Sequence, residues 1–154
     1  MKRAYFSALA ILGSHDDAME VSQLAFIRAY KNFDKYDRER NFFTWYYKIL
    51  RNLCLNRIRD NKRKNEIPLL ECTDIISDVN NAEETIEQNE LKQQVERALF
   101  SLKSEDREIL IMKEFDKLSY NEIAELLEVP VGSVMSRLFY ARKKLAAKLE
   151  KELV

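Results

Sequence analysis

Residues 118–145 read LSYNEIAELLEVPVGSVMSRLFYARKKL, with apolar residues at helical spacing on both sides of a short break. Ser119 and Glu122 have the spacing of a capping box, in which each side chain bonds the other residue's backbone amide at a helix start. The break at 128–130 contains Pro130, which a helix interior does not tolerate. We therefore predict two helices joined by a tight turn. Their inward sides are Ile123, Ala124, Leu126 and Leu127, then Val134, Leu138, Ala141, Leu145 and Leu149.

This pair of helices is typical of a helix-turn-helix, which places its second helix in the major groove of DNA. Ala124 is small where the two helices must approach closely, and the second helix continues into the basic run Arg142–Lys144. Periodicity alone leaves open a structural helical hairpin. The outward positions that could reach base edges and phosphates are Gly132, Ser133, Met135, Ser136, Arg137, Phe139, Tyr140 and Lys143.

The rest of the chain also has the period of helices, interrupted by only two Gly and two Pro in 154 residues. A helix should start at Asp16 and Asp17 and run to about Phe33, with Ala18, Val21, Ala25, Phe26, Ala29, Tyr30 and Phe33 on a wide apolar face. A second long helix should start near Phe42, with the stripe Trp45, Ile49 and Leu53, flanked by Tyr46 and Leu50, and later Ile58. Further helices should cover 91–102 and follow Ser104 as N-cap, the latter with the stripe Ile109, Leu110, Met112 and Phe115. The fold class is all-α, in two small helical domains at 1–64 and 86–154 joined by a linker at 65–85.

The net charge is zero, but its distribution along the chain is uneven. Residues 48–64 hold seven basic residues and one acid, and residues 131–151 hold six basic residues and one acid. Between these segments, residues 65–91 hold eight acids and no Lys or Arg. Two basic helices separated by an acidic spacer indicate two contacts with one polyanion, although a single charge run is usually a solvated helix face.

Several classes of protein and site are disfavoured. Cys54 and Cys72 form no CxxC pair and His15 is the only histidine, so a disulfide framework, a zinc site and a catalytic triad have no support. We expect no cofactor. The longest apolar run near the start, 8–12, is too short for a membrane span or a signal peptide, which predicts a cytoplasmic protein. The acidic residues gather in the spacer rather than beside the basic faces, which argues against a nucleic-acid enzyme.

The C-terminal half closely resembles the C-terminal domain of bacterial sigma factors. The resemblance rests on residues 118–127, 130–134 and 136–138, with Ser101-Leu102 and 107–110 before them. Independently, Asp17-Ala18, Gln23, 25–30, 42–45 and Asn52 look like the N-terminal conserved domain of the same family. Because a short linker joins the two domains with no third domain between them, the resemblance is to the extracytoplasmic-function group.

The resemblance implies a role for each half. The first domain would grip the clamp helices of core RNA polymerase through Asp17, Glu20, Gln23 and Ile27, with Leu24 standing where the family usually has an acid. The loop from Tyr36 through Asp37 and Arg38 to Asn41, with Asn52 beneath it, would form the pocket for a base flipped from the minus-ten element. Lys48, Arg51, Asn56 and Arg59 would hold the phosphates of the opened strand.

The second domain would place the helix from Val131 in the major groove of the minus-thirty-five element. Met135 and Tyr140 stand where relatives often have basic residues, which makes the preferred upstream sequence hard to derive. The chain also starts inside what should be the family's first helix, so roughly one helix of the first domain is expected to be missing. The expected partners are core RNA polymerase, promoter DNA and, by resemblance only, an anti-sigma factor.

Three alternatives stay open at this point. Trp45 and its aromatic neighbours could stack on opened bases, but Trp45 shares a helical stripe with Ile49 and Leu53, which favours core packing. Asn52 could be a helix-surface amide bonded to nearby backbone rather than a base reader. The chain as a whole could be a stand-alone helix-turn-helix regulator that binds duplex DNA as a dimer, although that interpretation gives no account of Gln23, the aromatic block or Asn52.

Overall fold

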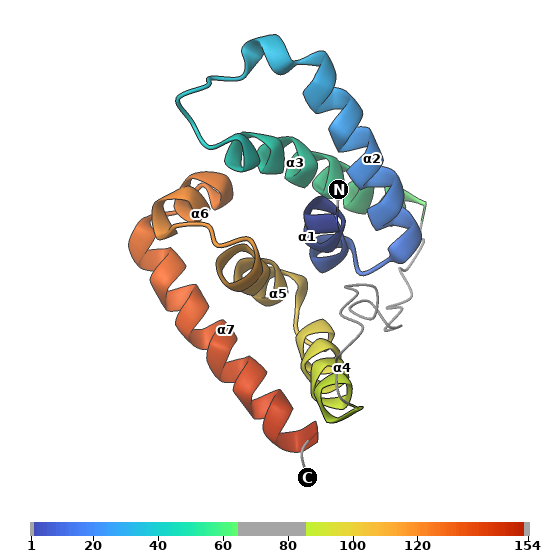
Figure 1. The fold of residues 1–154 in the computed structure, drawn as a ribbon, viewed down its shortest axis with the longest axis vertical. Helices are drawn as coiled ribbons and strands as arrows, with labels where there is room; N and C mark the ends of the chain where they lie inside the picture. Colours follow the sequence, from blue (N-terminus) through green and yellow to red (C-terminus); the bar gives the residue numbers. More distant parts are fainter. Residues whose placement is uncertain (1, 65–85, 153–154) are drawn as a thin grey trace.

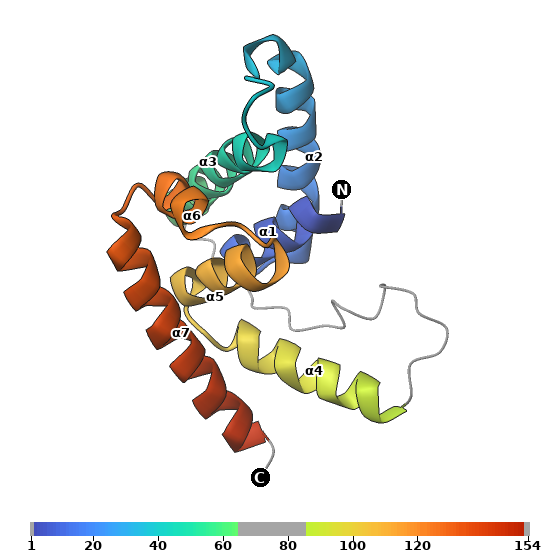
Figure 2. The same ribbon diagram turned by 60° about the vertical axis from the view of Figure 1, so that its left-hand side comes forward.

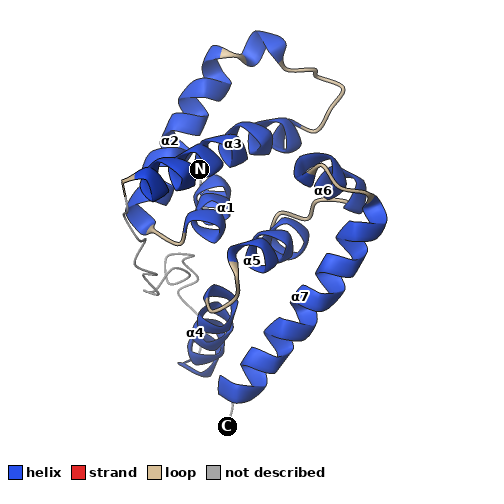
Figure 3. Ribbon diagram, turned by 180° about the vertical axis from the view of Figure 1, so that it is seen from behind, coloured by secondary structure: helices blue, strands red, loops and turns tan. Residues whose placement is uncertain are grey.

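The computed structural model describes residues 2–64 and 86–152, and these residues form helices and loops without a strand (Figures 1 and 3). This confirms the all-α prediction. The linker at 65–85 and Cys72 lie outside the described residues. The helices form two groups, α1 to α3 at one end and α4 to α7 at the other, with α1 and α5 side by side between them (Figures 1 and 2).

The first group consists of α1 (Lys2–Leu12), α2 (His15–Lys31) and α3 (Phe42–Arg63), with a 3-10 turn η1 (Phe33–Lys35) after α2. Gly13 ends α1 at a φ of 67°, a left-handed conformation that glycine adopts without strain, and its amide donates to the Leu9 carbonyl over 2.8 Å. The N-cap of α2 is Ser14, whose hydroxyl accepts from the Asp17 amide. The predicted start signals Asp16 and Asp17 lie in the first turn, where carboxylates favour the helix N-terminus.

The apolar face of α2 is narrower than predicted. Its buried apolar residues are Ala18, Val21, Ala25 and Ala29, which are small enough for α1 and α3 to pack closely. Phe26, Tyr30 and Phe33 were predicted to belong to this face, but they are exposed. Helical periodicity groups these aromatics with the alanines, whereas the two neighbouring helices cover only one side of α2.

The apolar stripe predicted for α3 is confirmed at Tyr46, Leu50 and Leu53, which are buried. The first turns of the helix differ from the prediction. Trp45 and Ile49 are half-buried, whereas Tyr47, which was not predicted to be buried, is only 1% exposed. Tyr47 packs against the second group of helices rather than the first. The burial of a residue by a distant part of the chain cannot be read from the period of one helix. Cys54 is fully buried, as expected of a small core residue.

The second group consists of α4 (Ile86–Phe100), α5 (Ser104–Leu110), a π-helical turn η2 (Ile111–Phe115), α6 (Tyr120–Leu127) and α7 (Val131–Glu152). Two details differ from the prediction. The N-cap of α5 is Lys103, and Ser104 is the first helical residue. Phe115, predicted to be inward, is 57% exposed; it is the last residue of the π turn, whose wider spacing does not keep the α-helical stripe.

The helix-turn-helix pair has the predicted start, turn and inward residues. The Glu122 amide donates to the Ser119 hydroxyl over 3.1 Å and the Ser119 amide donates to the Glu122 carboxylate over 2.7 Å, so the capping box is complete. Glu128 adopts a left-handed conformation with φ of 55° and turns the chain between the two helices. Of the predicted inward residues, Ile123, Ala124, Leu126, Val134, Leu138 and Ala141 are buried, and Leu127, Leu145 and Leu149 are half-buried.

Two hydrophobic cores hold the molecule together, and each includes residues from the other group of helices. The first lies among α1, α2 and α3 and also contains Phe100 from α4. The second lies among α4 to α7 and also contains Ala10 from α1 and Tyr47 from α3. The two groups of helices are therefore packed against each other.

Candidate nucleic-acid interface

The basic face of α3 carries four of the nine residues predicted to bind the minus-ten element. Lys48, Asn52, Asn56 and Arg59 recur at three- and four-residue spacing, so they share one face of the helix, and all four are exposed. The Arg59 guanidinium donates to the Asn56 side-chain oxygen over 2.7 Å. This strip offers two cations and two amides to a ligand, which suits a nucleic-acid strand.

The loop before α3 is held by aromatic packing. The Tyr36 ring lies 5.2 Å from the Trp45 ring and 5.4 Å from the Phe42 ring, measured between centroids, and its hydroxyl donates to the Arg40 carbonyl over 2.6 Å. Asn41 caps α3 by accepting from the Phe43 amide over 2.9 Å. Trp45 is thus half-buried and packs against the loop and the first core, as the packing interpretation predicted. Of the remaining loop residues in the predicted site, Asp37 and Arg38 are exposed.

A cavity of about 290 Å³ lies between the start of α3 and α6. On the α3 side it brings together three residues of the predicted minus-ten site or its loop, Arg40, Asn41 and Lys48, and on the α6 side it is lined by Glu122 and Glu125. Asn52 is not among its lining residues. The two glutamates place negative charge opposite the basic face.

Polar contacts also tie α3 and its loop to the second group of helices. Thr44 donates to Glu122 over 3.0 Å, and Arg40 forms an ion pair with Glu125 at 3.2 Å. The most buried of these contacts involves Arg51, which was predicted to contact phosphate. Its guanidinium donates to the Glu108 carboxylate of α5 over 2.8 Å, with side-chain exposures of 23% for Arg51 and 8% for Glu108.

The Tyr47 hydroxyl donates to the same Glu108 oxygen over 3.3 Å. Burial, followed by the negative charge of Glu108, raises the pKa of Tyr47 well above its usual value, so this hydroxyl stays a donor at physiological pH. Glu108 therefore binds two groups of α3 at once. Sequence reasoning missed this residue. The sequence feature that could have pointed to it is the position of this acid immediately before Ile109-Leu110, which were predicted to face inward.

A second set of polar contacts joins α1 to α5 and η2. Arg3 forms an ion pair with Asp116 at 3.0 Å, and the Ser7 hydroxyl donates to the same carboxylate over 2.9 Å. Arg107, only 2% exposed, donates to the Ala10 carbonyl over 2.6 Å. Burial raises the pKa of Asp116, against the lowering effect of the hydrogen bonds from Ser7 and Arg3. These residues stabilise the packed arrangement of the two halves.

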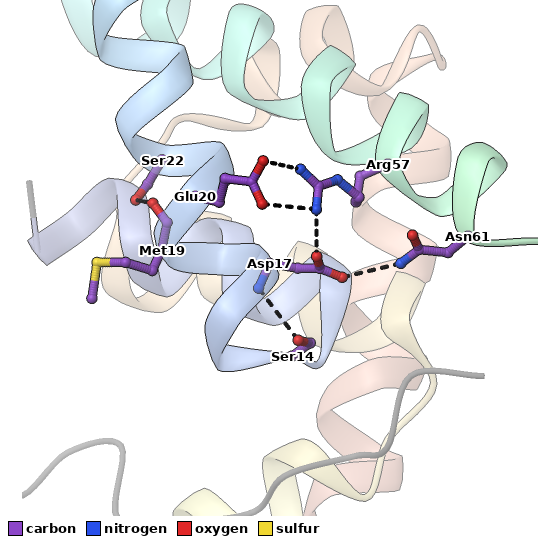
Figure 4. A network of polar contacts seen from close by, with 7 residues as sticks. All are labelled: Ser14, Asp17, Met19, Glu20, Ser22, Arg57 and Asn61. Atoms are coloured by element: carbon purple, nitrogen blue, oxygen red, sulfur yellow. Dashed lines mark hydrogen bonds and ion pairs between the residues drawn. The ribbon is translucent and has the colours of Figure 1, made fainter. Parts of the chain in front are cut away.

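The predicted polymerase-binding residues on α2 fall into two kinds. Figure 4 shows the first kind, Asp17 and Glu20, pointing toward Arg57 of α3. Arg57 pairs with Asp17 at 2.6 Å and with Glu20 at 2.7 Å, and the Asn61 amide donates to Asp17 over 3.0 Å. The hydrogen bond from Arg57 lowers the pKa of Glu20. Asp17 is mostly buried in this network, whereas the Glu20 side chain is 65% exposed and remains accessible.

The second kind, Gln23, Leu24 and Ile27, is exposed on α2, and Ile27 reaches 49% exposure. An exposed apolar surface beside polar residues is typical of a protein-binding site. Phe26 and Tyr30, at 55% and 78% exposure, extend the exposed apolar surface of this helix.

The outward side of α7 carries the residues predicted to read the minus-thirty-five element. Most of them are exposed, Ser133 is half-buried, and the Ser136 hydroxyl donates to the Gly132 carbonyl over 3.1 Å. Two cations of the basic run are already engaged, since Arg142 pairs with Glu114 and Lys144 pairs with Asp106, each at 2.6 Å. The exposed members of the predicted site are Gly132, Met135, Ser136, Arg137, Phe139, Tyr140 and Lys143.

Comparison with known proteins also divides the chain into a first and a second half. Residues 1–64 match the family model described as Sigma-70 region 2, and residues 92–145 match Sigma-70, region 4. The ECF RNA polymerase sigma factor SigW of Bacillus subtilis is 32% identical, over 96% of this chain and 83% of that protein. The ECF RNA polymerase sigma-E factor of Escherichia coli is also 32% identical, over 87% of this chain and 74% of that protein.

Two solved structures share the fold. The sigma factor RpoE of Bartonella quintana, in complex with the anti-sigma factor NepR, has a TM-score of 0.79 at 22% identity, over 97% of this chain and 89% of that chain. CnrH, in complex with the cytosolic domain of CnrY, has a TM-score of 0.63 at 25% identity, over 97% of this chain and 81% of that chain.

No helix in 2–64 or 86–152 has both the length and the hydropathy of a membrane span. The same part of the chain holds no group of three His, Cys, Asp or Glu residues placed to bind a metal ion. The matches over both halves identify the chain as a member of the extracytoplasmic-function group of RNA polymerase sigma factors.

Proposed function

We propose that this sigma factor reads the minus-ten element with α3 and the loop before it, and the minus-thirty-five element with α7, once it is bound to core RNA polymerase. Its family consists of transcription initiation factors rather than enzymes, and directs core polymerase to specific promoters. Two exposed helix surfaces support this assignment of sites. One is the strip of Lys48, Asn52, Asn56 and Arg59 on the first half, and the other is the outward side of α7 on the second half.

The polymerase-binding surface is assigned to α2. Gln23, Leu24 and Ile27 are exposed there, next to the accessible carboxylate of Glu20. Asp17 contributes by holding Arg57, and through it Glu20, in place. A stand-alone dimeric regulator accounts for α6 and α7 but leaves the match over residues 1–64 without a role.

We further propose that binding to core polymerase separates the two halves. In the packed arrangement Arg51 is engaged by Glu108, and Lys48 faces the acids of α6 across the cavity. Arg51 would need this contact exchanged for phosphate, and the acids of α6 would need to move away from Lys48, before the minus-ten strand could lie along α3. A protein that binds both halves in the packed arrangement would act as an inhibitor, and an anti-sigma factor in the cytoplasm is the partner that fits this role.

The test is promoter selection by the reconstituted holoenzyme. Core RNA polymerase with and without the chain is given a library of genomic fragments, and the transcript starts are mapped. The proposal predicts starts that need the chain and share two sequence elements at a constant spacing. Starts that are identical with and without the chain would contradict it.

A further inference from the structure

The outward side of α7 is apolar where a DNA-reading helix commonly carries charge. Met135, Phe139 and Tyr140 are 54%, 62% and 59% exposed. The rings of Phe139 and Tyr140 meet edge to face with centroids 5.3 Å apart, which holds both rings outward. We refer to these three side chains as the apolar face of α7.

A groove of about 540 Å³ runs beside this face. It is lined by the apolar residues Tyr120, Met135, Leu138 and Phe139 and bordered by the cations Arg142 and Lys143. Lys113 stands over the Tyr120 ring, with its ammonium 4.6 Å from the ring centroid. The groove is therefore lined by apolar side chains and two cations, of which Arg142 is paired with Glu114.

The N-terminal turn of α7 leaves room for a large ligand to approach. A side-chain atom added to Gly132 would meet nothing within 4 Å, so glycine at this position is not required by packing inside the protein. Residues 131–151 carry six basic residues and one acid. An apolar surface on a helix of this charge suits a polyanion that also has apolar groups, and duplex DNA is such a ligand because each thymine presents a methyl group in the major groove.

We propose that the apolar face of α7 reads thymine methyl groups, so that this chain selects thymines at upstream positions where an Arg or Lys would select guanine. The inference rests on the proposed function, because it requires α7 to enter the major groove. Arg and Lys recognise guanine through its O6 and N7 acceptors, which Met and Phe cannot contact by hydrogen bonds. Arg137 and Lys143, which are also exposed on α7, hold the phosphates.

The first test removes only the methyl groups. A promoter selected by the holoenzyme is synthesised with deoxyuridine in place of each upstream thymine in turn, which leaves base pairing unchanged. Burying one methyl is worth about 0.8 kcal/mol, so each thymine in contact should cost about three- to fourfold in affinity when replaced. Replacement of thymines in the spacer between the two elements is the control and should change nothing. If no upstream replacement lowers affinity while the holoenzyme still transcribes, the inference is wrong and the proposed function stands.

The second test changes the protein. With Met135→Lys, replacing thymine by deoxyuridine should no longer lower affinity at one base pair, and guanine should become preferred there. The matched control Met135→Leu should keep the thymine preference. Tyr140→Arg should do the same as Met135→Lys at a different base pair. Met135 is exposed, so these variants should fold. Weaker holoenzyme formation, with an unchanged base preference in the holoenzyme that does form, would show that the surface binds protein, and would overturn the inference. A holoenzyme that selects no promoter at all would refute the proposed function and the inference together.

Discussion

The guanidinium of Arg51 on α3 lies 2.8 Å from the carboxylate of Glu108 on α5, so a basic residue of the first half is neutralised by an acid of the second. The Tyr47 hydroxyl bonds the same oxygen, which fixes the orientation of the carboxylate. Thr44 with Glu122 and Arg3 with Asp116 join the two halves at other points. The two halves, which carry the two proposed DNA-binding surfaces, are therefore joined by specific pairs of side chains.

Breaking the central pair should increase the affinity of the free chain for DNA. In Glu108→Gln the side chain keeps its shape and loses its charge, which frees Arg51 to bind phosphate. We expect a several-fold gain in affinity for a promoter duplex at low salt, and a salt dependence steeper by about one unit because about one more phosphate is contacted. Fluorescence anisotropy at several salt concentrations measures both. Glu105→Gln, an exposed neighbour on α5, is the control, and equal behaviour of the two variants would contradict the prediction.

Asp116 should make stability depend on pH. Burial raises the pKa of its carboxyl in the folded state above the unfolded value of about 3.9. The folded state therefore keeps this proton up to a higher pH than the unfolded chain does. The contribution of the protonated carboxyl to the free energy of unfolding is lost as pH rises through the pKa of the folded state. Relative to wild type, Asp116→Asn should become more stable as pH rises from about 4 to about 7. Thermal unfolding of both proteins across this range measures it, with Asp37→Asn as an exposed control; a constant difference would refute the assignment.

The capping box of α6 should contribute about 1 kcal/mol to the free energy of unfolding. Ser119→Ala removes the acceptor of the Glu122 amide and leaves one of the first amides of α6 without its partner, a loss that typically costs about 0.5–2 kcal/mol. Ser119→Thr retains the hydroxyl and should remain near wild type. Urea unfolding of the three proteins gives the free energies. Equal stability of the Ala and Thr variants would show that the cap contributes nothing here.

Asn52 and Arg59 should differ in how they affect promoter binding. Asn52 offers an amide that both donates and accepts, so Asn52→Ala should relax preference at one minus-ten position at a cost of about 1–3 kcal/mol. Arg59→Ala should weaken binding evenly across sequences and reduce the salt dependence. Open-complex formation on promoters varied at each minus-ten base distinguishes the two. If Asn52→Ala leaves base preference unchanged, Asn52 is a helix-surface amide and does not read a base.

Local signals in the sequence were sufficient for most elements of the fold. The capping box at Ser119 and Glu122, the turn before Pro130 and the start of α3 near Phe42 are all determined by residues within a few positions of each other. The errors lie where the outcome depended on distant residues or on a local change of helix type. Phe26 and Tyr30 are exposed because no described helix covers that side of α2, and Phe115 is exposed because a π turn interrupts the period.

The sequence predicts which residues belong to the candidate site, but not how they are arranged. The charge runs and the family resemblance indicated the basic face of α3 and the outward side of α7. Neither showed that Glu108 engages Arg51 or that Arg57 holds Asp17 and Glu20. Pairs 37 to 57 residues apart leave no periodic signal in a single sequence, so only the structure identifies them.

The measurement that tests the account most directly is the affinity of the chain for a promoter duplex, with and without core RNA polymerase, at physiological salt. The packed arrangement, with Arg51 engaged and Lys48 facing acids, predicts weak and unselective binding by the chain alone. Adding core polymerase should give tight binding that depends on both promoter elements. Selective binding of the duplex by the chain alone at nanomolar concentration would contradict the account, and would show that this protein recognises DNA without a polymerase partner.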